Sequence, residues 1–313
     1  PLSLANMPRD TKICVLELGM NSPGEIKKLS EIAKPNVGII TNIGTAHAAK
    51  FKDPKNIAKE KSDIFSFFDE TSIAIIPFET DYYNLISKKA SQKTKLIYSF
   101  GQNKNCDFRI VTREKSISKL IIFDKEFKFK NNQSSGNWEQ NIIIILGLIR
   151  ILNIKIKNII PSIMKLKPIE GRGKEFQITH EKKSFTLIDE SYNSSPESLA
   201  KAIENLKNLK FNYTRKICVI GDMLELGKIS KSCHLKIVKN LLNTKPDIIL
   251  TVGKHSYTIF EKLPENFLKF HFKNYKNVFD KLLSMIENND IIMIKGSNST
   301  NLHLVSKRLI ELK

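Results

Sequence analysis

The feature that most constrains the fold is an alternation of short apolar runs with amphipathic segments of helical length. Strand-like runs in the first half are expected at residues 12–18, 37–41, 72–76 and 96–98, with helices at 24–33, 56–68 and 82–91. This alternation is typical of βαβ units, in which helices cover a parallel sheet. A length of 313 residues suggests two domains, at about 100–200 residues for each.

The periodicity changes after residue 107. Short alternating runs at 108–111, 117–123 and 127–130 indicate a small antiparallel β insertion, and two helices should follow at 137–152 and 156–165. Residues 167–173 combine Pro, Gly and charged residues, a composition typical of a hinge. A second α/β series then begins, with strands expected at 175–179, 184–188, 216–220, 247–251, 267–271 and 291–295. The fold class is therefore α/β, with domains at residues 1–167 and 168–313.

The charge balance is strongly basic, at +19 from 51 Lys and Arg against 32 Asp and Glu. The excess is mostly Lys, in a chain also rich in Ile and Asn, which indicates AT-rich coding rather than a selected nucleic-acid surface. The lysines are scattered and lack aromatic interleaving, so we expect no nucleic-acid partner. A basic surface would still attract phosphorylated substrates.

The cysteines and the longest apolar run indicate the cellular compartment of the protein. None of the four cysteines forms a CxxC pair, and Cys14 and Cys218 lie in apolar runs, as small core residues do. This usage suits a reduced cytoplasmic protein. The longest apolar run, 142–149, is too short to span a bilayer and predicts a buried helix rather than membrane insertion.

Potential metal ligands follow two neighbouring apolar runs in the first half. Glu17 ends one run and His47 follows the next. Ligands of open α/β sheets bind beyond the carboxyl ends of the strands, which favours a metal site here. Glu17 could hold Mg²⁺ or be an exposed strand end. Lys61, on an expected helix, reads by itself as one more surface lysine.

Polar residues also cluster at strand ends in the second half. Arg172, between two glycines, is either a phosphate-binding arginine or a chance linker residue. The segment 189–197 follows a strand and opens a helix. Helix capping explains Ser195 and Pro196. It does not explain three residues that look like ligand contacts, which are Asp189, Tyr192 and Asn193. Segments 221–227 and 295–300 are either ligand-binding loops or ordinary βα turns.

Taken together, these segments resemble the Mur ligase family over nearly the whole chain. The matching segments are Glu17-Leu-Gly-Met-Asn21, Thr41-Asn-Ile-Gly-Thr-Ala-His47, Lys59-Glu-Lys61-Ser-Asp-Ile-Phe65, Gly171-Arg172, Asp189-Glu-Ser-Tyr-Asn-Ser-Ser-Pro196, Gly221-Asp-Met-Leu-Glu-Leu-Gly227 and Lys295-Gly-Ser297. Their order and spacing are more specific than any single segment. Within the family, the fifth and sixth favour the member that adds D-alanyl-D-alanine. The Asp-Tyr-Ala-His and Asp-Asn-Pro-Arg segments of the diaminopimelate- or lysine-adding relative are absent.

The resemblance implies a central ATPase-type domain followed by a Rossmann-like C-terminal domain. It implies that ATP phosphorylates the terminal carboxylate of UDP-N-acetylmuramoyl-tripeptide, and that the amine of D-alanyl-D-alanine attacks the acyl phosphate. Catalytic residues that also hold Mg²⁺ would be Glu17, His47 and Lys61, the last as a carbamate. ATP would contact Asn141, Arg172, Asp189 and Asn193, and substrate would contact Tyr192, Lys295 and Ser297. A cytoplasmic monomer is expected.

The sequence also departs from the family pattern. Asn137 stands where a His is usual, Ala48-Ala49 replaces Leu-Glu, and Lys52 replaces a Gly. The family's UDP-binding domain and its Gly-Thr-x-Gly-Lys-Thr phosphate loop do not occur in these 313 residues. We therefore expect an N-terminally truncated sequence that binds ATP weakly and shows no ligase turnover. The alternatives are another Mur-type or folylpolyglutamate-type ligase, a non-catalytic remnant, and a basic nucleic-acid binder.

Overall fold

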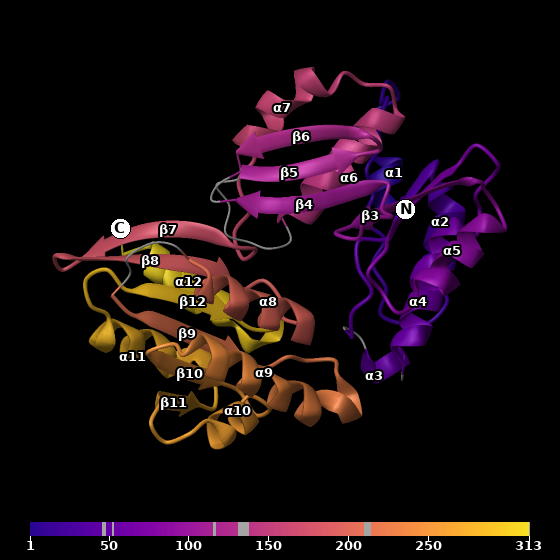
Figure 1. Ribbon diagram of the computed structural model, residues 1–313. Coiled ribbons are helices and arrows are strands. Elements are labelled where there is room, and N and C mark those ends of the chain that lie inside the picture. Colours follow the sequence, from indigo (N-terminus) through magenta and orange to yellow (C-terminus); the bar gives the residue numbers. More distant parts are fainter. Residues whose placement is uncertain (46–47, 52, 115–116, 131–137, 210–213, 313) are drawn as a thin grey trace. The chain divides into compact units, whose positions relative to one another are not determined.

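The computed structural model divides into two compact units (Figure 1). It describes residues 1–45, 48–51, 53–114, 117–130, 138–209 and 214–312. The first unit is built on Pro1–Asn131 and Asn137–Met164, and the second on Lys165–Lys313. The expected domain boundary after residue 167 stays a prediction.

The first unit contains one six-stranded sheet in the order β1-β2-β3-β4-β5-β6. Its strands are β1 (Val37–Ile39), β2 (Ile73–Pro77), β3 (Leu96–Gly101), β4 (Phe108–Glu114), β5 (Ile117–Ile122) and β6 (Lys125–Lys130). The first four run parallel, with Val37 opposite Ile73 and Ile73 opposite Leu96. β5 and β6 continue the same sheet in antiparallel pairing, which confirms the expected antiparallel runs.

Helices cover both faces of this sheet (Figure 1). They are α1 (Leu2–Ala5), α2 (Glu25–Ala33), α3 (Ala48–Phe51), α4 (Pro54–Ser62), α5 (Tyr83–Ser91), α6 (Trp138–Ile151) and α7 (Ile156–Lys165), with a 3₁₀ turn η1 (Asp63–Phe65). Ile75 of β2 packs in a core with Ile142 and Ile143 of α6. Its neighbour Ile76 packs on the opposite face with Ile86 of α5. The apolar run 142–149 is therefore part of a buried helix, as predicted.

The apolar run at residues 12–18 is not a strand. Ile13 and Val15 are 68% and 90% exposed, and Cys14 is exposed as well. A strand needs a neighbour to complete its hydrogen bonds, and the described residues supply none for this segment. The expectations of a strand here and of a core position for Cys14 are therefore wrong, whereas Cys218 is buried as expected.

The second unit contains a six-stranded sheet in the order β11-β10-β9-β12-β8-β7. Its strands are β7 (Lys174–His180), β8 (Lys183–Glu190), β9 (Lys216–Gly221), β10 (Ile248–Val252), β11 (Leu268–Phe272) and β12 (Ile291–Lys295). Only the β7–β8 hairpin is antiparallel. All other pairs in this sheet are parallel. The six strands expected from the sequence are confirmed.

Alternate residues of these strands face two separate cores. Val219 packs with α11 and α12, whereas Ile220 packs with α8 and α9 on the other face. The helices are α8 (Pro196–Lys207), α9 (Ser230–Thr244), α10 (Tyr257–Lys262), α11 (Val278–Met285) and α12 (Leu302–Ile310), with 3₁₀ turns η2 (Gly227–Ile229), η3 (Tyr275–Asn277) and η4 (Asn298–Thr300). A capping box between Ser195 and Ser198 starts α8, with Pro196 in its first turn, as predicted.

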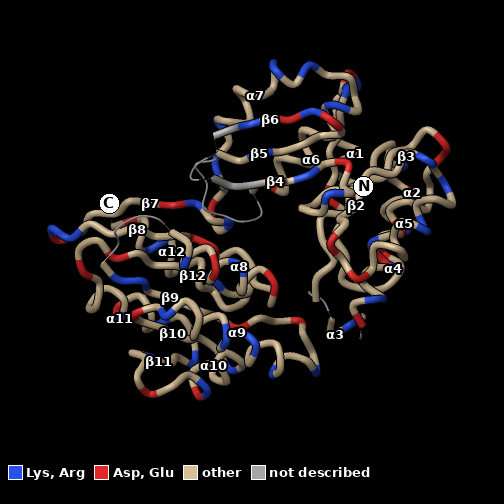
Figure 2. The backbone as a smooth tube through the Cα atoms, in the orientation of Figure 1, with Lys and Arg blue, Asp and Glu red and all other residues tan. Residues whose placement is uncertain are grey.

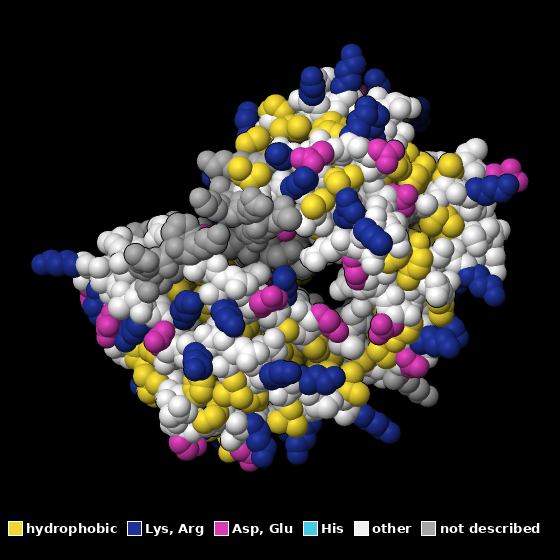
Figure 3. Space-filling model, viewed as in Figure 1, with side chains coloured by type: hydrophobic (Ala, Val, Ile, Leu, Met, Phe, Trp, Pro, Cys, Tyr) yellow, Lys and Arg dark blue, Asp and Glu magenta, His cyan; other side chains and the backbone are white. Residues whose placement is uncertain are grey.

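Charged residues are distributed along both units (Figure 2). On the face shown in Figure 3, Lys and Arg side chains are scattered among other residues rather than gathered over one element. Among the described residues, no helix has the length and apolar character needed to cross a membrane.

Candidate functional site

The polar residues predicted in the second unit lie where its parallel strands end. β8, β9, β10 and β12 all run in the same direction, so their carboxyl ends meet at one edge of the sheet. Such an edge is the usual ligand site of an open α/β sheet.

The Asp189 carboxylate shapes the turn that carries Arg172. One carboxylate oxygen accepts a hydrogen bond from the backbone N–H of Gly171 at 2.7 Å. The other accepts from the backbone N–H and the hydroxyl of Ser191 at 3.2 and 2.6 Å. Gly171 has φ of 76°, and a Cβ there would lie 2.8 Å from the Cβ of Tyr192. Both oxygens of this buried carboxylate are therefore engaged by the protein itself.

The neighbouring polar side chains remain exposed. The Arg172 guanidinium lies 4.4 Å from the centre of the Tyr192 ring, in a cation–π contact. Arg172, Tyr192 and Asn193 are all exposed to solvent. The structure thus brings four predicted residues together, and three of them are accessible to a ligand.

Lys295 is buried at the end of β12, next to the same turn. Its ammonium lies 3.3 Å from a carboxylate oxygen of Glu190 and donates to the carbonyl of Asn193 at 2.9 Å. Burial lowers the pKa of Lys295, and the attraction to Glu190 offsets part of that effect. Lys295 therefore ties β12 to the loop after β8.

Ser297 joins three of the strand-end loops. Its hydroxyl accepts a hydrogen bond from the backbone N–H of Leu224 at 2.9 Å and donates to the carbonyl of Ser194 at 3.3 Å. Its own N–H donates to the carbonyl of Asp222 at 3.0 Å. Ser194 places a buried hydroxyl oxygen beside it that has no hydrogen-bond partner among the described residues.

Asp222 is a buried residue of this edge whose role the sequence did not reveal. A single carboxylate oxygen accepts from the backbone N–H groups of His255 and Ser256, at 3.0 and 2.7 Å. Gly253 makes room for it, because a Cβ at Gly253 would lie 2.5 Å from the carboxylate carbon. Asp222 therefore links the loop after β10 to the loop after β9. The one sequence signal that could have indicated Asp222 was its position directly after an apolar strand.

His234, on α9, is also absent from the predicted site. It is completely buried, its Nε2 accepts from the N–H of Met223 at 3.1 Å, and its Nδ1 lies 2.8 Å from the carbonyl of Ser230. These partners require a neutral imidazole with the proton on Nδ1. Burial lowers the pKa of His234, which favours the same neutral form.

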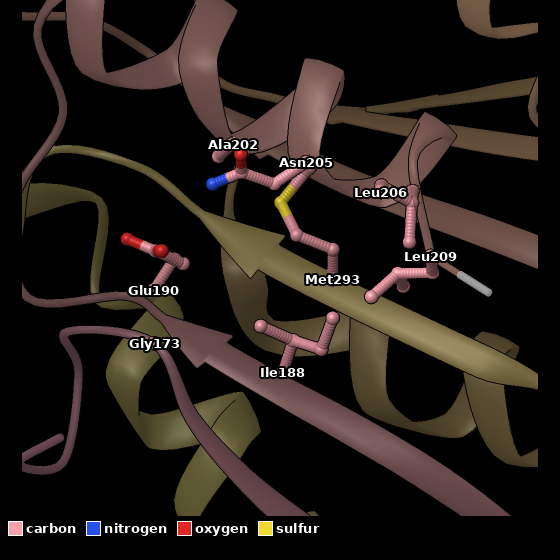
Figure 4. Close-up of a pocket in the computed structure, with 8 residues that line it drawn as sticks. All are labelled: Gly173, Ile188, Glu190, Ala202, Asn205, Leu206, Leu209 and Met293. Atoms are coloured by element: carbon pink, nitrogen blue, oxygen red, sulfur yellow. The ribbon is translucent and has the colours of Figure 1, made fainter. Parts of the chain in front are cut away.

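A shallow hollow lies beside this edge, between α8 and the sheet (Figure 4). Ile188 and Met293 line it from the strands, and Ala202, Asn205 and Leu206 line it from α8 (Figure 4). Glu190 is the only charged residue of the lining. An apolar hollow that offers so few polar groups is typical of imperfect packing rather than of a site for a phosphorylated ligand.

In the first unit, Lys61 is held at the end of β1. It lies on α4, and its ammonium donates to the carbonyl of Asn42 at 2.7 Å. Glu17 is exposed and makes no hydrogen bond or ion pair within the described part of the chain. His47 lies outside the described residues.

Asn141 is exposed on α6, and Gln140 beside it donates to the carbonyl of Thr41 at 3.3 Å.

The side chains of this region suit Mg²⁺ only if Lys61 is carbamylated. No group of three His, Cys, Asp or Glu side chains within the described residues is arranged to hold a metal. The ammonium of Lys61 is a hydrogen-bond donor, as its contact to Asn42 shows, and cannot ligate a cation. Carbamylation would turn it into an oxygen ligand of the kind that Mg²⁺ prefers, as the accessible carboxylate of Glu17 already is.

Comparison with known proteins shows the family of the chain. The family described as Mur ligase middle domain matches residues 1–148, and the Mur ligase, glutamate ligase domain matches residues 176–298. A UDP-N-acetylmuramoyl-tripeptide–D-alanyl-D-alanine ligase from Rickettsia prowazekii is 31% identical over 306 residues, covering 96% of this chain and 67% of that protein. The chain belongs to the Mur ligase family.

Another relative carries the same name, and two solved structures share the fold. A Bacillus subtilis protein of the same name is 28% identical, over 99% of this chain and 67% of its own length. Among solved structures, MurF from Acinetobacter baumannii has a TM-score of 0.86 at 24% identity, covering 99% of this chain and 67% of its own. MurF from Thermotoga maritima in complex with ADP has a TM-score of 0.85 at 24% identity, over 99% and 70%. This Mur ligase chain thus spans about two thirds of the length of these relatives.

Proposed function

We propose that the chain is part of an ATP-dependent ligase that joins D-alanyl-D-alanine to UDP-N-acetylmuramoyl-tripeptide in peptidoglycan precursor synthesis. The observation that carries the proposal is a relative of that name, 31% identical over 96% of this chain. The ADP complex of the similar MurF supports ATP as the nucleotide. We also propose a cytoplasmic monomer, as expected for the family.

The second unit would bind the nucleotide and the peptide substrates at its strand-end edge. Arg172 is accessible and planar, which suits a phosphate group, and the exposed amide of Asn193 suits a hydroxyl or ring nitrogen. Asp189 is committed to backbone donors. Its arrangement favours a positioning role for Asp189 over the direct nucleotide contact expected from the sequence. Tyr192 would orient Arg172 through their ring contact.

Lys295 and Ser297 would also act mainly through the loops that they hold. Lys295 is buried against Glu190 and the carbonyl of Asn193, so its charge is felt at the edge without direct exposure. Ser297 fixes the loops after β8 and β9 relative to one another. Both residues therefore support the proposed substrate contacts.

The first unit would hold Mg²⁺ through Glu17, His47 and Lys61 as its carbamate. The ion would supply positive charge that offsets the crowding of phosphate oxygens. Asn141, exposed on α6, would face the adenine. The protein's remaining task is to place the substrate carboxylate in line with the terminal phosphate, and then the incoming amine next to the acyl phosphate that results.

The proposal is tested with the gene product that contains this chain. Phosphate release is measured with UDP-N-acetylmuramoyl-tripeptide and a panel of acceptors that includes D-alanyl-D-alanine, single amino acids and glutamate. We expect D-alanyl-D-alanine alone to stimulate release. Stimulation by a different acceptor would assign the chain to another Mur-type or folylpolyglutamate-type ligase, and no stimulation by any acceptor would support a non-catalytic remnant.

A further inference from the structure

Two carboxylates hold the loop that links Glu17 to α2. Glu25 accepts hydrogen bonds from the backbone N–H groups of Asn21 and Ser22, at 2.6 and 3.2 Å. These bonds lower the pKa of Glu25, with the bond from Asn21 contributing most. Glu25 is only partly buried, and among the described residues its hydrogen bonds go to positions within four residues of itself. Its contribution is therefore local to the turn.

Glu60 is the second carboxylate, and its role is different. It lies on α4, is only 6% exposed, and accepts from the backbone N–H groups of Gly24 and Ile26 at 2.8 and 2.9 Å. These donors are the N-cap and the second residue of α2. The first N–H groups of a helix have no partner within the helix and carry the positive end of its dipole. A carboxylate bound there is favourable, so Glu60 fastens the start of α2 to α4.

The residue that follows Glu60 fastens a second loop to the same helix. Lys61 donates to the carbonyl of Asn42, which lies in the loop after β1. Consecutive residues of one helix therefore hold two segments, the loop after Glu17 and the loop before His47. α4 acts as a common support for both loops.

We propose that Glu60 is a positioning residue, which sets the Glu17 loop against the helix that carries Lys61. The inference rests on the proposed function, because it takes Glu17 and the Lys61 carbamate as magnesium ligands. A metal site requires its ligands to be held within a few tenths of an ångström of the productive geometry. Glu60 supplies this constraint across 34–36 residues of sequence, with each of its carboxylate oxygens bound to a backbone N–H group.

The first test measures whether Glu60 holds the loop. Glu60→Gln keeps the shape of the side chain but retains only one acceptor oxygen, so one of the two N–H groups faces an NH₂ donor. We expect the amides of Gly24 and Ile26 to exchange hydrogen about tenfold faster or more, as fits the loss of one buried hydrogen bond. Glu31→Gln is the matched control, because Glu31 is exposed on α2, the helix whose start Glu60 holds, and undergoes the same change of charge. Unchanged exchange in Glu60→Gln would overturn the proposal.

The second test asks whether the loop position matters for metal binding. Binding of Mn²⁺ alone to the 313-residue chain, equilibrated with bicarbonate, is followed by electron paramagnetic resonance. We expect Glu60→Gln to weaken Mn²⁺ binding several-fold, Glu31→Gln to leave it unchanged, and Glu17→Gln to remove it. Faster loop exchange with unchanged Mn²⁺ affinity would show that Glu60 serves only the fold, which would overturn the positioning role. Absence of saturable binding in the unsubstituted chain, unaffected by Glu17→Gln, would instead reject the magnesium site of the proposed function, and the positioning role with it.

Discussion

Breaking the buried pair between Lys295 and Glu190 should destabilise the second unit strongly. The side chains are 4% and 17% exposed, and the ammonium also supplies the hydrogen bond to the carbonyl of Asn193. Lys295→Met keeps the apolar stem but leaves Glu190 as a partly buried charge without its partner. Removing one member of a buried ion pair costs about 3–5 kcal/mol, and we expect a loss of about this size.

Removing both charges should be much less costly. Burial lowers the pKa of Lys295 despite the attraction of Glu190, so desolvation outweighs the pairing energy. The double variant Lys295→Met/Glu190→Gln should therefore lie within about 1 kcal/mol of the unsubstituted chain. The double-mutant cycle isolates the coupling between the two side chains.

The assay must report on the second unit alone, because two units need not unfold together. Urea-dependent hydrogen exchange of peptides from β12 gives the free energy of unfolding of that unit. Lys201→Met is the matched control, since Lys201 pairs with Glu204 at 3.0 Å on the exposed face of α8 and should contribute less than about 1 kcal/mol. A cost for Lys295→Met as small as that of the control would refute the reasoning. So would a double variant as unstable as the single one.

The pH dependence offers an independent check on Lys295. Because its pKa in the folded state is lower than the ordinary 10.5, the unfolded state binds more protons in the alkaline range below 10.5. The free energy of unfolding therefore gains a contribution that rises with pH through this window. Lys295→Met should lose that contribution. An unaltered alkaline slope would show that the ammonium is not desolvated as the structure indicates.

Three further predictions follow from single sites. Burial lowers the pKa of His234 below its ordinary 6.5, so the free energy of unfolding should fall as pH drops below 6.5. In urea unfolding, His234→Gln should flatten this pH dependence. An identical pH dependence in the variant would contradict the neutral, buried state of His234. Gly253→Ala should lower the free energy of unfolding by about 1–3 kcal/mol, because a φ of 114° is strained for alanine and the new Cβ would meet the Asp222 carboxylate. An unchanged stability would contradict the close approach of Gly253 to Asp222. Ile75→Ala should lower the free energy of unfolding by about 2–5 kcal/mol, because Ile75 is completely buried. Ile13→Ala should lower it by less than about 0.5 kcal/mol, because Ile13 is 68% exposed. Equal losses would show that residue 13 is buried in solution.

Elements whose signal is local could be predicted from the sequence. β9, β10 and β12 are mostly apolar runs, buried along their length except at Lys216, the first residue of β9. Such strands require no knowledge of their neighbours to be recognised. The start of α8 is equally local, because Ser195 and Ser198 satisfy one another within one turn. These elements bring the polar residues predicted in the second unit to one edge of its sheet.

The roles of individual polar residues could be predicted less well. Asp189 had the sequence context of a ligand contact, yet its oxygens bond to Gly171, 18 residues earlier, and to Ser191. Glu60 bonds to Gly24 and Ile26, which are 36 and 34 residues away. A carboxylate that binds a ligand and one that binds a distant backbone N–H have the same signature in sequence. Only the hydrogen-bond partners in the folded structure distinguish the two kinds of carboxylate.

The exposed run at residues 12–18 shows the same limit for backbone structure. Its apolar pattern describes a surface that would be stabilised by burial, but a strand also needs hydrogen-bond partners on a neighbouring strand. In β2 both requirements are met, because β1 and β3 pair with it and helices cover its faces. At Val15, which is 90% exposed, neither is met within the described residues. An apolar pattern therefore predicts a strand correctly only where a neighbouring strand is present to pair with it.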